Sequence, residues 1–256
     1  MANFWNIVKE VIERADIVLE VLDARLVGET RNNEAEMKVE KLGKKIIYII
    51  NKCDLVSREY MENFSKIKEM KDVRPFVFVS STKRLGSKKL RDQIMIEATR
   101  MKHDFPMIRV GVIGYPNTGK SSVINMLKGR KSAPTSSYSG FTKGIQEVKA
   151  SKKITLFDSP GVIPFMEKDE VKHSLIGSRN PQKIKDPEIV FYSLNSHLKY
   201  RGLSLARYYG AEEGADEEET LENIAIKKRM LKKGGKADTE RVARGIIDDW
   251  QKGKIR

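Results

Sequence analysis

The stretch Arg109-Val-Gly-Val-Ile-Gly-Tyr-Pro-Asn-Thr-Gly-Lys-Ser121 decides the fold of this 256-residue chain. Its first five residues predict a buried strand, and Gly114 to Ser121 has the glycine, lysine and hydroxyl spacing of a phosphate-binding (Walker A) loop. A helix is expected to begin near Gly119, so the loop stands between a strand and a helix, as this motif requires. Taken alone, the stretch could also be an ordinary glycine-rich turn before a helix.

The residue types of this loop suit a phosphate group. Backbone N–H groups of the loop and of the helix N-terminus can surround a β-phosphate. Gly119 lets the backbone approach closely, Lys120 brings positive charge to the β- and γ-phosphates, and the Ser121 hydroxyl is a candidate Mg²⁺ ligand. The predicted nucleotide-binding residues of this segment are Asn117, Thr118, Gly119, Lys120, Ser121 and Ser122.

A second motif, Asn51-Lys-Cys-Asp54, follows the apolar stretch at 45–50, which predicts a strand. The Asp54 carboxylate can accept two hydrogen bonds from the N1–H and N2–H₂ edge of guanine, a donor pair that adenine lacks. The stem of Lys52 can lie along the base, and Asn51 can tie this loop to the phosphate loop. After the next predicted strand, at 75–79, the turn of Ser80 and Ser81 can offer backbone N–H groups to guanine O6.

A third motif, Asp158-Ser-Pro-Gly161, follows the apolar stretch 154–157. An aspartate at this place holds Mg²⁺ in P-loop NTPases, and the Gly161 N–H can contact the γ-phosphate and release it after hydrolysis. Thr142 lies between the phosphate loop and this motif and is the candidate second hydroxyl ligand of Mg²⁺, although it could be an ordinary loop threonine. All these motifs stand at strand ends, where open α/β sheets bind ligands.

Apolar strands alternate with helical stretches up to about residue 165, which predicts an α/β P-loop NTPase fold with a mostly parallel sheet. Only helix-like segments follow, near 169–177, 186–200, 218–233 and 238–252. We therefore expect a GTPase domain at 1–165 and a small all-helical, RNA- or ribosome-binding domain at 166–256. The guanine loop precedes the phosphate loop here, so the motif order is circularly permuted, which a domain with neighbouring ends tolerates.

This order resembles that of the circularly permuted GTPases of the YlqF/RbgA-like ribosome-assembly family. The resemblance covers nearly the whole chain and includes Ala15-Asp-Ile-Val18 through Asp23-Ala-Arg25, Lys183-Ile-Lys-Asp-Pro-Glu188, and Lys233-Gly-Gly-Lys-Ala-Asp238 through Gln251-Lys-Gly253. It implies a GTPase that binds the assembling large ribosomal subunit and contacts rRNA. The chain has no histidine before His103, so a Gly-His element found near the N-terminus of bacterial relatives does not transfer.

The sequence identifies the residues for GTP hydrolysis less clearly than those for GTP binding. Val162 stands where Ras-type enzymes carry a water-orienting glutamine, and its side chain cannot hydrogen-bond water. Asn117 matches the phosphate-loop asparagine with which many GTPases of this kind hold K⁺, whose charge would act beside the phosphates. Asn117 could instead only shape the loop. The residues expected to carry catalysis are Lys120, Gly161 and Asn117.

The net charge of +14 indicates a polyanionic partner, most often nucleic acid, since rRNA is contacted largely through Lys and Arg on its phosphates. A lysine-rich solvated surface of the kind seen in heat-adapted proteins is the alternative. The segments Lys227-Lys-Arg229 and Lys232-Lys233 are candidates for RNA contact or for the solvated face of one helix. The mean hydropathy of −0.49 and the lack of a long apolar run exclude a transmembrane span.

The leading hypothesis is a slow GTPase switch for assembly of the large ribosomal subunit, with GTP/GDP, Mg²⁺ and K⁺ as its ligands. We expect a cytoplasmic protein, because the single cysteine permits no internal disulfide. We also expect it to be a monomer. A GTP-liganded RNA-binding module with little hydrolysis is the alternative. A GTP-dependent enzyme acting on a small molecule or tRNA ranks last, since 166–256 shows no second catalytic cluster. An ATPase conflicts with Asp54.

Overall fold

The described part of the chain comprises residues 2–101, 107–129, 145–161, 163, 167 and 169–255 of a computed structural model. The chain divides into two compact units, Met1–Glu167 and Lys168–Arg256. The division falls close to the boundary that the sequence predicts near residue 165. Each unit is described by itself below.

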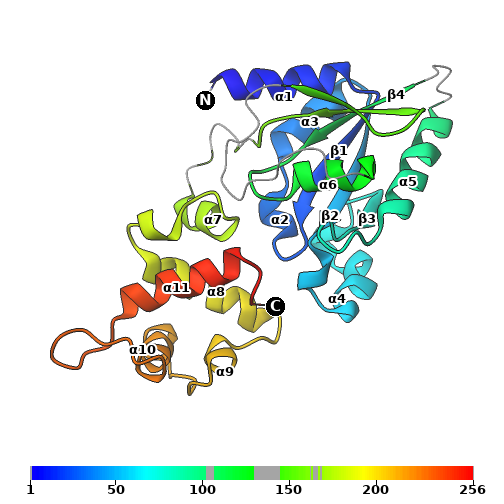
Figure 1. The fold of residues 1–256 in the computed structure, drawn as a ribbon. Coiled ribbons are helices and arrows are strands. Elements are labelled where there is room, and N and C mark those ends of the chain that lie inside the picture. Colours follow the sequence, from blue (N-terminus) through cyan, green and yellow to red (C-terminus); the bar gives the residue numbers. More distant parts are fainter. Residues whose placement is uncertain are drawn as a thin grey trace. The chain divides into compact units, whose positions relative to one another are not determined.

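The first unit is built on a six-stranded sheet with the order β3-β2-β1-β4-β6-β5 (Figure 1). Its strands are β1 (Ile17–Asp23), β2 (Lys45–Asn51), β3 (Phe76–Phe78), β4 (Ile108–Ile113), β5 (Gln146–Lys149) and β6 (Ile154–Asp158). All neighbouring pairs are parallel except β5 with β6, which is antiparallel. The predicted α/β fold with a mostly parallel sheet is confirmed, and only edge strand β5 runs the other way.

Helices cover both faces of this sheet, so its central strands are apolar on both sides, as expected for parallel strands. On one face, α1 (Ala2–Arg14) and α3 (Asn33–Lys41) pack over strand residues such as Val18. On the other face, α5 (Ser87–Arg100) and α6 (Lys120–Lys128) pack over Ile17, Leu19 and Val21. A short helix, α2 (Val27–Thr30), follows β1. Every residue of β1 is buried, which fixes this strand at the centre of the core.

The segment at 57–71 is not one continuous α-helix. The structure has α4 (Arg58–Asn63), followed by two 3₁₀ turns, η2 (Phe64–Lys66) and η3 (Lys68–Met70). The apolar residues Met61, Phe64, Ile67 and Met70 recur at every third position, which is the spacing of a 3₁₀ helix rather than an α-helix. Phe64 is fully buried and packs edge-on against Phe76 and Phe78 of β3, so this contact favours the tighter winding.

The second unit is helical in its described residues. It comprises α7 (Glu170–Leu175), η4 (Pro181–Lys183), α8 (Pro187–Tyr200), α9 (Leu205–Tyr209), α10 (Glu217–Lys227) and α11 (Thr239–Gln251). The core between α8 and α11 contains Phe191, Leu194, Ile246 and Trp250, and the Trp250 indole N–H donates to the Leu175 carbonyl at 2.9 Å. Among the described residues, no helix has both the length and the apolar character that crossing a bilayer requires.

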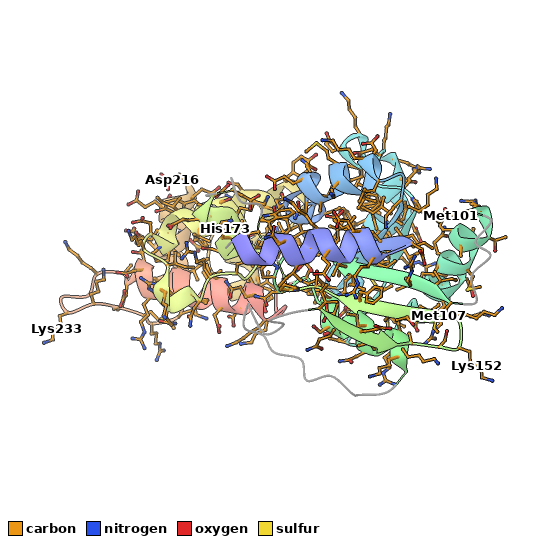
Figure 2. All side chains as sticks on the ribbon, turned by 90° about the horizontal axis from the view of Figure 1, so that it is seen from above. Met101, Met107, Lys152, His173, Asp216 and Lys233 are labelled. Carbon is orange, nitrogen blue, oxygen red and sulfur yellow. The ribbon has the colours of Figure 1, made fainter. Side chains whose placement is uncertain are left out.

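The helix predicted at 218–233 ends six residues earlier, at Lys227. Arg229 takes a left-handed backbone conformation with φ 54°, and Leu231 forms an antiparallel bridge with Ala237. Residues 231–237 therefore form a hairpin-like loop, closed by the Lys232 N–H donating to the Lys236 carbonyl at 2.8 Å. Figure 2 shows Lys233 at the outer end of this loop.

Candidate functional site

The predicted site loops follow strands whose carboxyl ends meet at one edge of the sheet. Strands β1 to β4 and β6 are parallel, so the loops after β2, β3, β4 and β6 all leave from this edge. These loops carry the guanine motif, the serine turn, the phosphate loop and the Asp158 motif. The four loops therefore lie close together despite their permuted order in the sequence, because the parallel strands bring them to the same edge of the sheet.

The phosphate loop has the backbone that a ring of N–H groups requires. Gly114 and Gly119 have positive φ angles of 142° and 96°, and Asn117 has φ 60°. A side chain at Gly114 would lie 2.5 Å from the carbonyl oxygen of Val21, and one at Gly119 would collide with the amide of Asn51. Both glycines are therefore required by close approach and by their left-handed φ angles. Asparagine tolerates such a conformation, which fits a loop-shaping role for Asn117.

Lys120 folds back over this loop. Its ammonium donates to the carbonyls of Gly114 at 3.0 Å and Tyr115 at 2.8 Å. Burial lowers the pKa of Lys120 to about 8, and the nearby carboxylate of Asp158 works against this shift. A buried cation with this environment is poised to meet an anion, because phosphate charge would restore its preference for the protonated form.

Asn51 joins three of the four loops. Its side-chain N–H₂ donates to the Thr118 carbonyl at 2.8 Å, and its side-chain oxygen accepts from the Ser81 N–H at 3.1 Å. Asn51 is 1% exposed. Asn51 thus forms the hydrogen bond that links the guanine loop to the phosphate loop. The same side-chain amide also binds the serine turn.

The serine turn uses its polar groups internally. Ser80 is fully buried, and its hydroxyl lies 3.2 Å from the Thr82 hydroxyl and accepts from the Lys83 N–H. The Ser81 N–H is engaged by Asn51. The backbone N–H of Thr82 is therefore this turn's candidate donor to a base.

Ser121, Asp158 and Gly161 lie together on the phosphate-loop side. The Ser121 hydroxyl donates to the Asp158 carboxylate over 3.3 Å, so a hydroxyl and a carboxylate oxygen already face each other. A side chain at Gly161 would lie 2.7 Å from the Pro116 Cα and 2.8 Å from the Lys120 ammonium. Only a glycine can therefore bring its backbone this close to the phosphate loop. Ser122 follows Ser121 in the first turn of α6.

The guanine loop contains contacts that the motif alone does not reveal. Lys52 has φ 61°, and its ammonium donates to the Asp23 carboxylate at 2.8 Å. Lys83 lies with its ammonium 3.9 Å from the carboxylate of Asp54. Lys83 was not predicted as a site residue, because it stands beyond the serine turn, outside the four-residue motif. Thr142 and Val162 lie outside the described residues.

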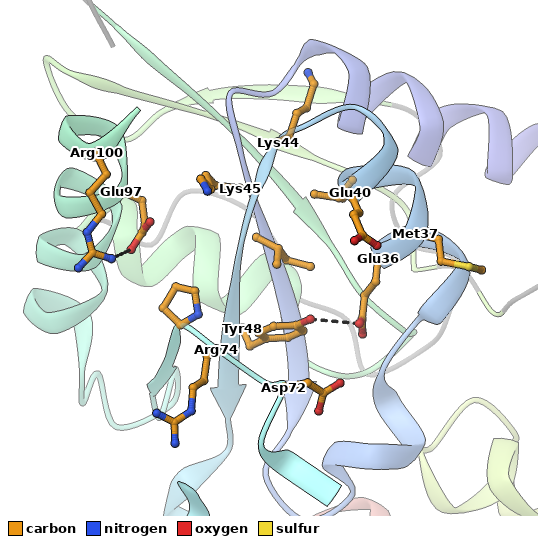
Figure 3. Close-up of a pocket in the computed structure, with 13 residues that line it drawn as sticks. Glu36, Met37, Glu40, Lys44, Lys45, Tyr48, Asp72, Arg74, Glu97 and Arg100 are labelled. Atoms are coloured by element: carbon orange, nitrogen blue, oxygen red, sulfur yellow. Dashed lines mark hydrogen bonds and ion pairs between the residues drawn. The ribbon is translucent and has the colours of Figure 1, made fainter. Parts of the chain in front are cut away.

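A separate cavity of about 420 Å³ lies at the opposite, amino-terminal end of β2 (Figure 3). Polar and charged side chains line it and pair with one another: the Tyr48 hydroxyl donates to Glu36 at 3.0 Å, and Arg100 donates to Glu97 at 2.8 Å. It contains none of the predicted site residues. Across the described residues, no cluster of three His, Cys, Asp or Glu side chains could hold a metal ion.

Comparison with known proteins identifies relatives along the whole chain. Residues 109–231 match the family described as 50S ribosome-binding GTPase. An uncharacterised GTP-binding protein of Methanocaldococcus jannaschii is 38% identical over 251 residues, which are 98% of this chain and 65% of that protein. Nucleolar GTP-binding protein 2 of Saccharomyces cerevisiae is 34% identical over 257 residues, 99% of this chain and 52% of that protein.

A solved structure matches this chain over nearly its whole length. The crystal structure of GNP-bound YlqF from T. maritima matches with a TM-score of 0.63 and 25% identity, covering 98% of this chain and 94% of that chain. The aligned part of this chain includes both the guanine loop and the phosphate loop that follows it in the sequence. The chain therefore has the fold of YlqF, a circularly permuted GTPase, and is similar in sequence to GTP-binding proteins. The chain spans 65% of the archaeal relative and about half of the nucleolar relative.

Proposed function

We propose that this chain is a GTP-hydrolysing switch protein in the assembly of the large ribosomal subunit. The observation that carries the nucleotide part is the Asn51 amide, which binds the phosphate loop at Thr118 and the serine turn at Ser81. A base-binding and a phosphate-binding segment held by one side chain suit a ligand with both a base and phosphates. The name of the matching family supports the ribosomal part.

Guanine would be recognised by Asp54. Its carboxylate would accept from N1–H and N2–H₂, while the Thr82 N–H would donate to O6. The stem of Lys52 would lie along the base. The 3.9 Å separation of Lys83 and Asp54 adds a cation that would neutralise this carboxylate until the base arrives.

The residues present fit a magnesium ion. Mg²⁺ prefers oxygen ligands, and the Ser121 hydroxyl and the Asp158 carboxylate oxygens already lie 3.3 Å apart. Thr142 would supply a second hydroxyl, and Asn117 would hold K⁺. The magnesium ion would neutralise negative charge on the β- and γ-phosphates.

The protein groups around the phosphates have separate tasks. Lys120 would exchange its two loop carbonyls for β- and γ-phosphate oxygens, since a buried ammonium gains most from an anionic partner. The Gly161 N–H would bind the γ-phosphate and lose this partner on hydrolysis. The segment that follows leads into the helical unit, so GTP would favour the ribosome-bound form and hydrolysis would favour release.

The RNA contact would include the loop at 231–237, which we call the lysine loop. Residues 227–236 contain six cations and no acid: Lys227, Lys228, Arg229, Lys232, Lys233 and Lys236. Lys232, Lys233 and Lys236 are exposed and lie beyond the end of α10, so they do not form the solvated face of one helix. Exposed ammonium groups on a protruding loop can approach several phosphates at once.

A GTP-liganded RNA-binding module with little hydrolysis is the second candidate. The observation in its favour is Val162, whose side chain offers no hydrogen bond to an attacking water. A cytoplasmic monomer stays our prediction for either candidate.

The experiment that separates the two candidates is the steady-state GTPase rate in K⁺ buffer, with and without purified large ribosomal subunits. We expect GTP-specific stimulation by the subunit, with ATP as the control nucleotide. GTP binding without turnover, with mature or immature subunits present, would favour the passive module. Replacing K⁺ by Na⁺ tests Asn117 separately, and equal rates would remove K⁺ from the proposal.

A further inference from the structure

A buried ion cluster lies beside the guanine loop. The Asp23 carboxylate, at the end of β1, accepts from the Arg25 guanidinium through Nε at 3.1 Å and Nη2 at 2.8 Å. It also accepts from the Arg25 backbone N–H at 3.0 Å and from the Lys52 ammonium at 2.8 Å. Four donors therefore converge on the two oxygens of Asp23, and one of them belongs to the guanine motif.

Burial makes these contacts strong. The side chains of Asp23 and Arg25 are each 3% exposed. Burial alone would raise the pKa of Asp23, but the charges of Arg25 and Lys52 outweigh it and hold that pKa well below its ordinary value. Burial lowers the pKa of Lys52, and Asp23 opposes this shift. The carboxylate thus keeps the Lys52 ammonium charged and in one place.

The cluster acts on a strained part of the backbone. Lys52 has φ 61°, a left-handed conformation that is unfavourable for a residue with a side chain and needs support from its surroundings. Lys52 directly precedes the 3₁₀ turn η1 (Cys53–Leu55), which carries Asp54. The Ala24 N–H donates to the Asn51 carbonyl at 2.8 Å, so the segment that bears the cluster is also fastened to the guanine loop through its backbone.

We propose that Asp23, held by Arg25, is a positioning residue for guanine-nucleotide binding that anchors the Lys52 ammonium and so fixes the Lys52 stem along the base. This inference rests on the proposed GTP function. Asp23 acts through Lys52 and does not touch the nucleotide. Arg25 supplies the second cation that lets a carboxylate stay ionised at this buried position.

A double-mutant cycle tests the role of Asp23 in the full-length protein. GDP affinity is measured by calorimetry for wild type, Asp23→Asn, Lys52→Met and the double variant. Because coupled residues do not act additively, we expect Asp23→Asn to weaken GDP binding about tenfold in wild type and hardly at all in the Lys52→Met background. Equal losses in the two backgrounds would overturn the proposal, since a merely structural aspartate acts without regard to Lys52.

Asp16→Asn is the matched control. Asp16 lies just before β1, at the strand's other end, and forms a comparable two-pronged pair with Arg109 at 2.6 and 3.2 Å. It should leave GDP affinity within about twofold of wild type, because Asp16 lies at the end of β1 away from the guanine loop. A loss equal to that of Asp23→Asn would refute the positioning role.

Two further outcomes are distinguishable. If Asp23→Asn does not fold, Arg25→Lys replaces it, because lysine keeps the charge but loses the two-pronged contact. We expect a several-fold loss of GDP affinity that disappears in the Lys52→Met background, and a loss that persists there would overturn the inference. Wild-type protein that fails to bind GDP would instead overturn the proposed function itself.

Discussion

The side-chain amide of Asn51 donates a 2.8 Å hydrogen bond to the carbonyl of Thr118, across 67 residues of sequence. The same side chain accepts from the Ser81 N–H, so one buried amide links three loops of the candidate site. In a chain whose motif order is permuted, this contact spans from the early guanine loop to the later phosphate loop.

Replacing this amide should loosen both the fold and the site. We expect Asn51→Ala to lower the free energy of unfolding by about 1–3 kcal/mol, since the buried Thr118 carbonyl and the partly buried Ser81 N–H lose a partner. GDP affinity should fall with it. Thermal unfolding and calorimetry measure the two effects. Asn63→Ala is the control, because Asn63 donates to the Glu59 carbonyl at an exposed position; an equal loss in both variants would refute the special role of Asn51.

Gly161→Ala should block the switch. The added Cβ would lie 2.7 Å from the Pro116 Cα and 2.8 Å from the Lys120 ammonium, and the backbone of the phosphate loop cannot yield easily. We expect the GTPase rate to fall at least about tenfold, as for a lost transition-state donor. Gly245→Ala is the control, because nothing lies within 4 Å of that added Cβ in α11. An unchanged rate in Gly161→Ala would remove Gly161 from the mechanism.

Glu20 should make stability depend on pH. This carboxyl lies in the middle of β1, fully buried, and accepts from the Asn32 N–H at 2.7 Å. Burial, and next the charge of Glu36, raise its pKa well above 4.5. The unfolded chain therefore releases this proton first, so Glu20 contributes stability at low pH that is lost as the pH rises above 4.5 toward the folded-state pKa.

Glu20→Gln should remove this dependence. Glutamine keeps the acceptor for Asn32 and stays neutral, so the variant should be more stable than wild type at pH 7 and its stability should vary less with pH. Chemical denaturation from pH 4 to 8 measures both, with the exposed Glu40→Gln as control. A variant that is less stable at pH 7 would show that Glu20 is needed in its charged form.

The lysine loop should set the salt dependence of RNA binding. Changing Lys232, Lys233 and Lys236 together to glutamine should weaken rRNA binding and reduce the slope of log affinity against log salt by about 2 to 3. The control changes the equally exposed Lys66, Lys68 and Lys71 of the first unit, which removes the same charge. Equal effects of the two triple variants would indicate net charge alone, and not a contact by the lysine loop.

Much of the fold follows from the sequence because the strong signals are local. The strands β2, β4 and β6 are short apolar runs, and each precedes a motif whose chemistry is tied to a strand end. The antiparallel direction of β5 could not be predicted, because its four residues form an edge strand whose partner is set by tertiary pairing. The five-residue helix α9 was missed because so short a segment shows no period.

Site residues could be predicted where they belong to a sequence motif. They could not be predicted where their role depends on a partner that is distant in the sequence. Asp54 and Lys120 belong to known spacings, whereas Asp23 gains its role only from the register that places it beside Asn51 of β2. The 3₁₀ turns η2 and η3 could not be distinguished from an α-helix by sequence, because a period of three and a period of 3.6 differ little over a few turns. The packing of Phe64 against β3 then favours the 3₁₀ turn over an α-helix.

Nucleotide specificity tests the central claim, a single guanine site built from permuted loops, most directly. Calorimetric titration compares GDP, ADP and XDP for wild type and Asp54→Asn. We predict that wild type binds GDP and discriminates against ADP by at least about 100-fold, since a site that pairs with a donor rejects a base lacking it. Asp54→Asn should lose GDP and gain XDP. Equal affinity of wild type for ADP and GDP, or unchanged GDP binding in Asp54→Asn, would contradict it.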